Sequence, residues 1–280
     1  MAVTIRTLEN FVGGEWVTST GDSARRVVSP VTGETLAEAP DASADDVDRA
    51  VAAARTAQPK WAALSAWERA KICHAIADLI DERREDFARE LSLEQGKPYA
   101  SEALGDIDET AENFRIAAED VKRMETAIIP SQDPNKRILT FRKPNGVYAG
   151  ITPWNFPTLI PVELIAPGIA AGNTIVIKPS EWTPIAMATF MQAMADAGLP
   201  EGVVNVVYGG GEVGERLIQD ENALRRAAHL SGAEEAAEDG ALSGPLEIRV
   251  FAHDHRPVAA RLDQRALEAC GPHDLLRRRV

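Results

Sequence analysis

Only two cysteines, Cys73 and Cys270, occur among the 280 residues of this chain. Two cysteines cannot build a disulfide framework, so the sequence fits a protein of a reducing compartment. Basic side chains are also in short supply, because 30 lysines and arginines stand against 43 aspartates and glutamates. The resulting formal net charge of −13 argues against a nucleic-acid partner, which requires a basic face. It also gives no reason to expect binding to anionic lipid.

Long hydrophobic runs are missing as well. The longest apolar stretch covers residues 159–172, contains Glu163 and two prolines, and is too short to cross a bilayer. Residues 1–16 show no basic segment followed by an apolar run, so nothing there indicates a signal peptide. We therefore expect a cytoplasmic protein without a membrane partner.

The residues that are present suffice for a large hydrophobic core, with 45% apolar residues and a length typical of two domains. The first half is patterned mainly for helices. Ser43 is placed to cap one helix, and Ser65 with Glu68 has the spacing of a capping box at the start of another. Further segments are predicted to form a hairpin at 11–16, helices at about 85–95 and 102–124, and a short strand at 138–141.

After Gly146 strand-like runs alternate with helices. The runs VYAGIT, IVIKP and VVNVVY are rich in β-branched residues. Between the last two, Thr183 can cap a helix whose first turn accepts Pro184 and which ends at Gly198. This alternation predicts an α/β protein with a parallel sheet covered by helices on both faces.

The composition changes again near residue 220. Residues 221–280 contain four of the five histidines and nine arginines but no lysine, and no alternation of strands and helices is visible after Ser231. We therefore predict that residues 1–220 form the patterned region and that residues 221–280 form an atypical tail.

The first segment whose residues suit ligand binding or catalysis is GVYAGITPWNFP. It places Thr152, Pro153, Trp154 and Asn155 directly after a predicted strand. Loops at the carboxyl ends of parallel strands are where α/β sheets bind ligands. The amide of Asn155 can donate a hydrogen bond to an oxyanion. Taken alone, a role in closing a turn explains Asn155 better.

The second segment is IVIKPSEWTP. Lys178 follows a strand and precedes a helix, so its ammonium can meet a phosphate or a ribose hydroxyl near the amino terminus of that helix. Glu181 can accept hydrogen bonds from a ribose diol. A solvated Lys–Glu pair in a loop is the simpler alternative, and this segment alone does not exclude it.

The third segment, YGGGEVG, gives Gly209, Gly211 and Gly214 the G-x-G-x-x-G spacing of a pyrophosphate cradle. Such a cradle belongs in the first βαβ unit of a dinucleotide fold, whereas two strand–helix steps precede this one. We therefore favour a tight turn against which a cofactor can lie.

These three segments, in this order and at this spacing, closely resemble the aldehyde dehydrogenase family. The family carries T-P-W-N-F-P, then K-P-S-E, then a G-x-G turn, and the upstream segments FVGGEW and LEQGKP agree with it. The resemblance covers roughly residues 10–218. It implies a Rossmann-like parallel sheet with flanking helices of the aldehyde dehydrogenase type, and part of an oligomerisation element near residues 125–145.

The resemblance also implies roles for individual residues. Asn155 matches the asparagine whose amide steadies the oxyanion of the thiohemiacetal. The remaining matches are to cofactor-binding positions: Ile151, Thr152, Pro153, Trp154 and Asn155 along the cofactor, Lys178, Ser180 and Glu181 at the adenosine ribose, and Gly211 on the adenine side. Glu181 favours NAD, while Lys178 can tolerate the 2′-phosphate of NADP, so both cofactors stay open. An aldehyde substrate and a homo-oligomer of the full-length enzyme are implied too.

The residues of covalent chemistry are not found. The family's nucleophile lies in a G-Q-x-C segment and its general base in E-L-G-G, and neither segment occurs here. Cys270 lies in the unrelated LEACGPHD, and Cys73 lies beside the apolar stripe of a helix, where cysteine behaves as a small hydrophobe. His74 is expected on or near a helix surface, and His253, His255 and His273 have no metal-binding spacing.

We therefore expect an aldehyde dehydrogenase fold without its catalytic domain, truncated or frame-shifted after about residue 220. His229 and the three residues after it resemble a degraded H-L-T-G-S, beyond which the similarity stops. The chain is expected to be inactive alone. The alternative is a non-catalytic remnant that binds a nucleotide or a partner subunit.

Overall fold

The computed structural model describes residues 5–136, 138–219 and 227–229. The strands are β1 (Arg6–Thr7), β2 (Asn10–Val12), β3 (Glu15–Val17), β4 (Ala24–Val28), β5 (Thr35–Pro40), β6 (Ile128–Ile129), β7 (Ile138–Leu139), β8 (Val147–Ile151), β9 (Thr174–Lys178), β10 (Val204–Val206) and β11 (Ala227–His229). The helices are α1 (Ala44–Ala63), α2 (Ala66–Glu82), α3 (Arg84–Gln95), the π-helical turn η1 (Tyr99–Ala103), α4 (Leu104–Lys122), α5 (Leu159–Ala170), α6 (Pro184–Asp196) and α7 (Gly211–Gln219). The α/β class predicted from the sequence is confirmed.

The main sheet has the strand order β11-β8-β9-β10-β2-β3. Strands β11, β8, β9 and β10 are mutually parallel, and β10 pairs antiparallel with β2 of the amino-terminal hairpin. Strand β10 therefore lies inside the sheet, between β9 and β2. A second sheet has the order β1-β5-β4, with β4 and β5 antiparallel.

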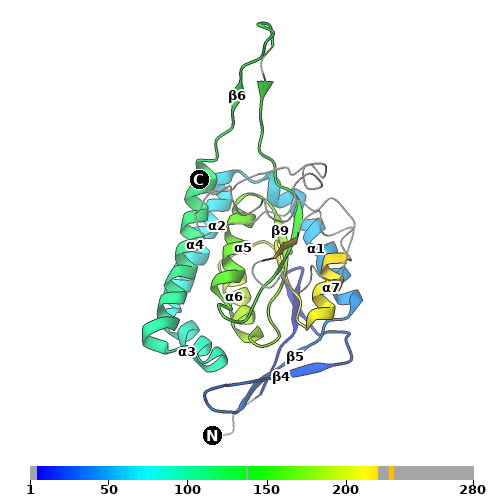
Figure 1. Ribbon diagram of the computed structural model, residues 1–280, viewed down its shortest axis with the longest axis vertical. Helices are drawn as coiled ribbons and strands as arrows, with labels where there is room; N and C mark the ends of the chain where they lie inside the picture. The colour runs from blue at the N-terminus through cyan, green and yellow to red at the C-terminus, as the bar shows by residue number, and fades with distance from the viewer. Residues whose placement is uncertain (1–4, 137, 220–226, 230–280) are drawn as a thin grey trace, which may run out of the picture. The chain divides into compact units, whose positions relative to one another are not determined.

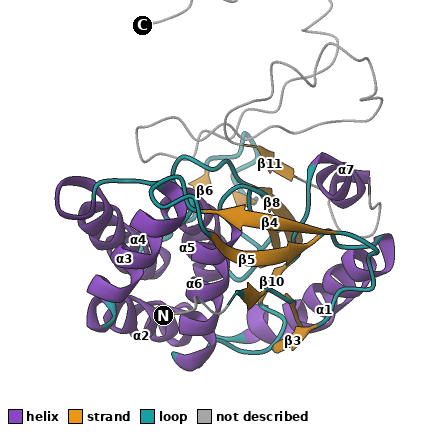
Figure 2. Cartoon of the chain, turned by 90° about the horizontal axis from the view of Figure 1, so that it is seen from below, coloured by secondary structure: helices purple, strands orange, loops and turns teal. Residues whose placement is uncertain are grey.

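Both faces of the main sheet are covered, as the alternation of strands and helices predicts. On β9, Ile175 and Ile177 belong to the larger apolar cluster with α5, α6 and the helices α2 to α4. Val176, between them, belongs to the cluster that α1 and α7 form on the other face. This period of two is the expected geometry of a strand buried on both sides. Figures 1 and 2 show the two helical layers flanking the strands.

The helix starts show where local signals suffice. Ser43 and Ser65 cap α1 and α2 and form capping boxes with Asp46 and Glu68. Gly96, at φ 81°, ends α3 in the left-handed conformation that glycine adopts readily. Thr183, by contrast, makes no side-chain cap on α6.

The amino terminus of α6 is capped from a distant helix instead. The buried carboxylate of Glu94, on α3, accepts hydrogen bonds from Ile185 N at 2.6 Å and Ala186 N at 2.8 Å. Burial raises the pKa of Glu94 to about 8, and the two backbone N–H groups oppose that rise. The prediction of a Thr183 cap is therefore wrong, because a tertiary contact supplies the acceptor.

Helix α5 occupies the apolar stretch that is too short for a membrane span. It is buried on nearly all sides between the sheet and α4, so it has no polar stripe that would reveal a helical period. In the described part of the chain, no helix combines the length and apolar character needed to cross a membrane.

Strands β6 and β7 form an arm that projects away from the sheet and helices (Figure 1). The two strands pair antiparallel, with Ile128 opposite Leu139 and Ile129 opposite Ile138. All four of these side chains are exposed. The arm coincides with the segment near residues 125–145 for which the family resemblance implies an oligomerisation element, and that role stays a prediction.

Candidate functional site

The loops after β8, β9 and β10 come together at the carboxyl edge of the parallel sheet. Ile151, the last residue of β8, is in register with Lys178, the last residue of β9. The next backbone amide, Thr152 N, donates to Lys178 O at 3.1 Å. The sheet thus brings the TPWN and KPSE segments, 23 or more residues apart in sequence, to one edge. This is the edge at which parallel sheets bind ligands.

Lys178 is buried, with 5% of its side chain exposed. Its ammonium donates to Pro179 O at 3.0 Å and to Gly209 O at 2.9 Å, so two of its three N–H groups are committed to backbone carbonyls. Burial lowers the pKa of Lys178, and the nearby charge of Glu181 opposes that shift. The lysine therefore joins the end of β9 to the turn formed by residues 209–211 after β10, here called the glycine turn. Its third N–H group remains available.

Glu181 is the more accessible member of the pair. Its carboxylate oxygen lies 3.8 Å from Lys178 Nζ, and 29% of its side chain is exposed. The turn that presents it is fixed by Ser180, whose hydroxyl oxygen accepts from Trp182 N at 3.2 Å and whose carbonyl accepts from Thr183 N at 3.3 Å. Glu181 thus offers a carboxylate oriented by a buried cation and reachable from solvent.

The glycine turn leads directly into a helix. Gly209 has φ +143°, and a Cβ built on it would lie 2.4 Å from a methyl group of Val213, so the turn requires glycine there. Gly211 begins α7, and a Cβ on it would meet nothing within 4 Å. Gly214 packs α7 against Lys178 and Ile151. The segment is a tight turn, as the sequence predicts, and it is followed by a helix that the sequence analysis did not assign.

A further side of the site, which no sequence motif predicted, comes from Arg25 on β4 and from Asp41, the residue that follows β5. Arg25 Nε donates to Asp41 Oδ1 at 2.9 Å, and Gly210 N donates to the same oxygen at 3.2 Å. Burial raises the pKa of Asp41, but hydrogen bonds from Arg25 and Ser23 lower it by more, to a value below the usual one. Asp41 therefore ties the small sheet to the glycine turn. No motif marks Arg25 and Asp41, which lie about 170 to 185 positions before Gly210 in the sequence.

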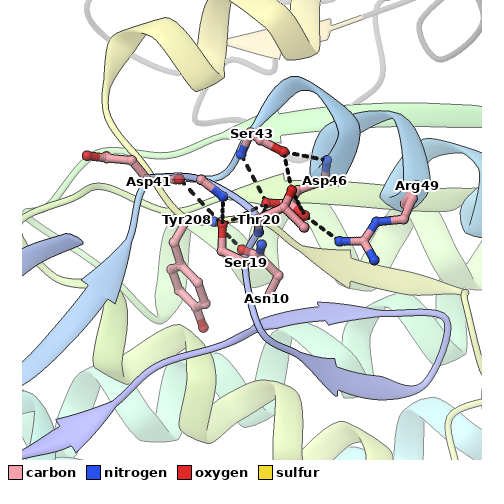
Figure 3. Close-up of polar contacts among 9 residues, drawn as sticks. Asn10, Ser19, Thr20, Asp41, Ser43, Asp46, Arg49 and Tyr208 are labelled. Carbon is pink, nitrogen blue, oxygen red and sulfur yellow. Dashed lines mark hydrogen bonds and ion pairs between the residues drawn. The ribbon is translucent and has the colours of Figure 1, made fainter. Parts of the chain in front are cut away.

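The segment after Asp41 is anchored as well (Figure 3). Ala42 N donates to Tyr208 O at 2.8 Å, and Tyr208 N donates to Asn10 Oδ1 at 3.1 Å. Ser19 donates to the carbonyl of Asp41 at 3.4 Å and to the carboxylate of Asp46 at 2.7 Å. The glycine turn therefore rests on a hydrogen-bonded frame built from the amino-terminal strands and the start of α1.

In the TPWN loop, the side chains of Thr152 and Trp154 differ in their surroundings. The Thr152 hydroxyl is buried and has no hydrogen-bond partner among the described residues. The Trp154 side chain is exposed, and its backbone carbonyl accepts from the Thr183 hydroxyl at 3.5 Å. A buried hydroxyl without a partner is costly, so it marks a place where a further polar group would be favourable. Pro153, between them, is half-buried.

Asn155 is exposed, and its side-chain amide makes no hydrogen bond within the described chain. Its backbone carbonyl is held instead, by Gln95 Nε2 at 3.3 Å and Lys97 Nζ at 3.3 Å. Lys97 is itself buried, pairs with Asp106 at 2.5 Å and lies 3.8 Å from the centroid of the Phe156 ring. The loop backbone is therefore fixed while the amide stays available.

Lys97 and Gln95 belong to the LEQGKP segment, which the sequence analysis used only as a sign of resemblance. The structure shows that the segment positions Asn155. Hydrophobic patterning could not have revealed this contact, because the residues that meet lie about 58 positions apart on different elements.

Cys73 and His74 are the candidates for covalent chemistry that the structure describes. Cys73 is fully buried in the core, and burial raises the pKa of its thiol to about 12, which excludes a thiolate nucleophile at neutral pH. His74 lies on the surface of α2 and pairs with Glu119 at 3.0 Å. Within the described ranges, no cluster of histidine, cysteine, aspartate and glutamate could hold a metal ion. Cys270, the three tail histidines and the predicted tail other than 227–229 lie outside the described residues.

The model of the aldehyde dehydrogenase family matches residues 16–234. A glutarate-semialdehyde dehydrogenase of Pseudomonas aeruginosa is 39% identical over 226 residues, which are 80% of this chain and 46% of that protein.

Two solved structures illustrate the likeness of the fold. An NAD-dependent aldehyde dehydrogenase from Sinorhizobium meliloti has a TM-score of 0.76 at 37% identity, over 81% of this chain and 45% of that one. An Escherichia coli NADP dependent enzyme has a TM-score of 0.77 at 38% identity, over 80% of this chain and 46% of that one. The chain spans about half the length of the relatives that it matches. It belongs to the aldehyde dehydrogenase family.

Proposed function

We propose that this chain supplies the site for the adenosine half of NAD or NADP in an enzyme that oxidises an aldehyde to a carboxylic acid. The observation that carries the proposal is the Lys178–Glu181 pair, 3.8 Å apart at the carboxyl end of β9 and joined to the glycine turn through Gly209 O. A carboxylate and an ammonium at this edge have the chemistry to bind a ribose diol.

The available donors and acceptors fit that ligand. Glu181 can accept from the ribose hydroxyls, and the third N–H of Lys178 can donate to one of them. Ser180 shapes the turn that presents Glu181. Gly211 leaves open space beside the turn, as expected for a residue that lines the adenine side. The similar solved structures include an NAD-dependent aldehyde dehydrogenase and an NADP dependent enzyme, so we propose either cofactor.

The TPWN loop is proposed to serve the reacting end of the cofactor. Ile151, Thr152, Pro153 and Trp154 would lie along it, with the partnerless Thr152 hydroxyl as one polar contact. The unengaged amide of Asn155 would donate to the oxyanion that forms when a thiolate attacks the aldehyde carbon. The bound cofactor supplies the acceptor for the hydride that leaves this adduct.

Covalent catalysis itself requires a thiolate and a general base. The sequence holds neither G-Q-x-C nor E-L-G-G, and the buried Cys73 cannot serve. We therefore propose that this chain alone binds the nucleotide without turning over an aldehyde. Reduced-cofactor absorbance with short aliphatic and aromatic aldehydes should stay at baseline. Turnover that disappears on Cys270→Ala would contradict the proposal.

A role in subunit association is favoured by the β6–β7 arm. Ile128, Ile129, Ile138, Leu139 and Phe141 all expose large apolar side chains on or beside it. Clusters of exposed apolar residues mark protein contacts. We propose that the arm meets another subunit, in keeping with the homo-oligomer that the family resemblance implies. Sedimentation of a Phe141→Ser, Leu139→Ser variant should show a smaller assembly than the parent chain.

Calorimetric titration tests the nucleotide proposal. Glu181→Gln should weaken NAD binding about tenfold to a hundredfold, the cost of roughly 1.5–3 kcal/mol for a hydrogen bond to a charged group. Glu201→Gln is the matched control, because Glu201 is exposed and precedes the amino end of β10, away from the site. Equal effects of the two substitutions, or absence of NAD binding by the parent chain, would contradict the assignment.

A further inference from the structure

Arg25 is a cation at the candidate site that still has unused donors. It lies on β4, with 51% of its side chain exposed, and its Nε is committed to Asp41 at 2.9 Å. The two terminal nitrogens of the guanidinium make no hydrogen bond within the described chain. A guanidinium with a free pair of terminal nitrogens matches the geometry of a phosphate.

The guanidinium of Arg25 lies against the glycine turn. A Cβ built on Gly210 would lie 2.9 Å from Arg25 Nη2, so the guanidinium packs directly against that glycine. The neighbouring Gly209 accepts the hydrogen bond from Lys178. Lys178 and Arg25 therefore contact two successive residues of the same turn, Gly209 and Gly210. Lys178 is buried, whereas about half of the Arg25 side chain is exposed.

Arg25 interacts electrostatically with Glu181, the carboxylate proposed to bind the ribose. The hydrogen bond with Asp41 raises the pKa of Arg25, and the charges of Glu181 and Glu212 act in the same direction. The guanidinium thus contacts the carboxylate of Asp41 and feels the negative charges of Glu181 and Glu212. A phosphate placed beside Glu181 would be repelled by them unless a cation with free donors met it.

Lys178 is poorly suited to that task. It is almost fully buried, and two of its three N–H groups are used by Pro179 O and Gly209 O. Its one remaining donor can meet a ribose hydroxyl or a single phosphate oxygen, whereas a guanidinium with two free nitrogens can meet two phosphate oxygens at once.

We propose that Arg25 receives the 2′-phosphate of an NADP-type nucleotide and so decides whether this site accepts the phosphorylated cofactor. The proposal rests on the proposed function, because it assumes that the ribose binds at Glu181. Lys178 then serves the ribose hydroxyls in both cofactors, and Arg25 acts only when the 2′-phosphate is present.

The test compares two probes that differ in one phosphate, 5′-AMP and adenosine 2′,5′-bisphosphate, by calorimetric titration of the full chain. Arg25→Gln should weaken the bisphosphate by at least about tenfold and leave 5′-AMP within about twofold, as expected for loss of a charge-assisted contact. Arg25→Lys should fall between, because an ammonium keeps the charge but not the paired donors.

Arg26→Gln is the matched control. Arg26 is the next residue on the same strand, is also exposed, and pairs with Glu38 of β5. Because successive side chains of a strand point to opposite faces, Arg26 points away from the face that carries Arg25. It carries the same charge change and should alter neither affinity by more than about twofold, apart from weak long-range electrostatics.

The outcomes separate the two proposals. If the parent chain binds neither probe, the proposed function fails and this inference fails with it. If 5′-AMP binds but Arg25→Gln weakens both probes equally, the nucleotide site stands and Arg25 is only a structural contact of the turn. Binding of 5′-AMP without binding of the bisphosphate, or equal effects of Arg25→Gln and Arg26→Gln, also overturns the inference.

Discussion

Asp46 holds the frame beneath the glycine turn, and replacing it by asparagine should destabilise the fold strongly. The carboxylate is fully buried and accepts from Ser19 Oγ at 2.7 Å, Thr20 N at 3.0 Å, Thr20 Oγ1 at 3.1 Å and Ser43 N at 3.0 Å. Arg49 donates to it as well. Figure 3 shows these bonds converging on Asp46 beside Asp41 and Tyr208.

The magnitude follows from the charge and the hydrogen bonds. Burial raises the pKa of Asp46, but hydrogen bonds from Ser19, Ser43, Arg49 and Thr20 lower it by more, so that the net pKa falls from 3.8 to about 2. A shift of this size corresponds to about 2 kcal/mol of stability. In Asp46→Asn the amide nitrogen would also face donors, so the total loss should be roughly 2–4 kcal/mol.

The pH dependence has a definite sign. Because the folded pKa lies below the unfolded one, the ionised Asp46 stabilises the fold fully above about pH 4. That contribution is lost as the pH falls through about 2. The difference in unfolding free energy between the parent chain and Asp46→Asn should therefore be constant from pH 7 to about 5 and narrow below pH 4.

Urea unfolding followed by circular dichroism measures this difference, and Asp45→Asn is its control. Asp45 lies in the same first turn of α1, carries the same charge and is exposed. It should contribute only the interaction with the helix dipole, about 0.3–1 kcal/mol. Equal losses in the two variants would refute the argument that the buried network, rather than charge at the helix start, stabilises this region.

Three further outcomes are expected. Gly209→Ala should lower the free energy of unfolding by about 1–3 kcal/mol, because its Cβ would overlap an α7 side chain, and an unchanged melting temperature would contradict this. In a Cys270→Ser background, Cys73 should not react with a thiol reagent until the chain unfolds, since its thiol is buried with a pKa of about 12; rapid labelling of the native chain would refute this. Lys97→Met should cost about 3–5 kcal/mol by leaving Asp106 buried without its partner. Adding Asp106→Asn should recover much of that loss in urea unfolding, and no recovery would argue against the ion pair.

The sequence predicts best what neighbouring residues decide. The hairpin of β2 and β3 follows from Gly13 and Gly14, both of which have positive φ. The capping boxes at Ser43 and Ser65 involve residues three positions apart, and both are present. The strands β8, β9 and β10 are recognisable because their β-branched runs suit a sheet buried on both faces.

The sequence predicts less where distant residues decide. The cap of α6 comes from Glu94, about 90 residues earlier, although Thr183 occupies the position that local rules favour. The commitment of two of the three N–H groups of Lys178 depends on carbonyls that only the folded turn brings together. Arg25 joins the same site through a strand of another sheet, so no spacing in the sequence could have indicated it.

Hydrogen–deuterium exchange of the full chain with and without saturating NAD can locate the bound nucleotide on the backbone. If NAD binds at the carboxyl edge of the sheet, exchange should slow in peptides covering residues 178–183 and 208–214, and it should stay unchanged in the β6–β7 arm. Glu181→Gln should reduce this protection at the same NAD concentration. NAD binding that leaves both segments unprotected, or that protects only peptides elsewhere in the chain, would contradict the assignment of the nucleotide site to Lys178, Glu181 and the glycine turn.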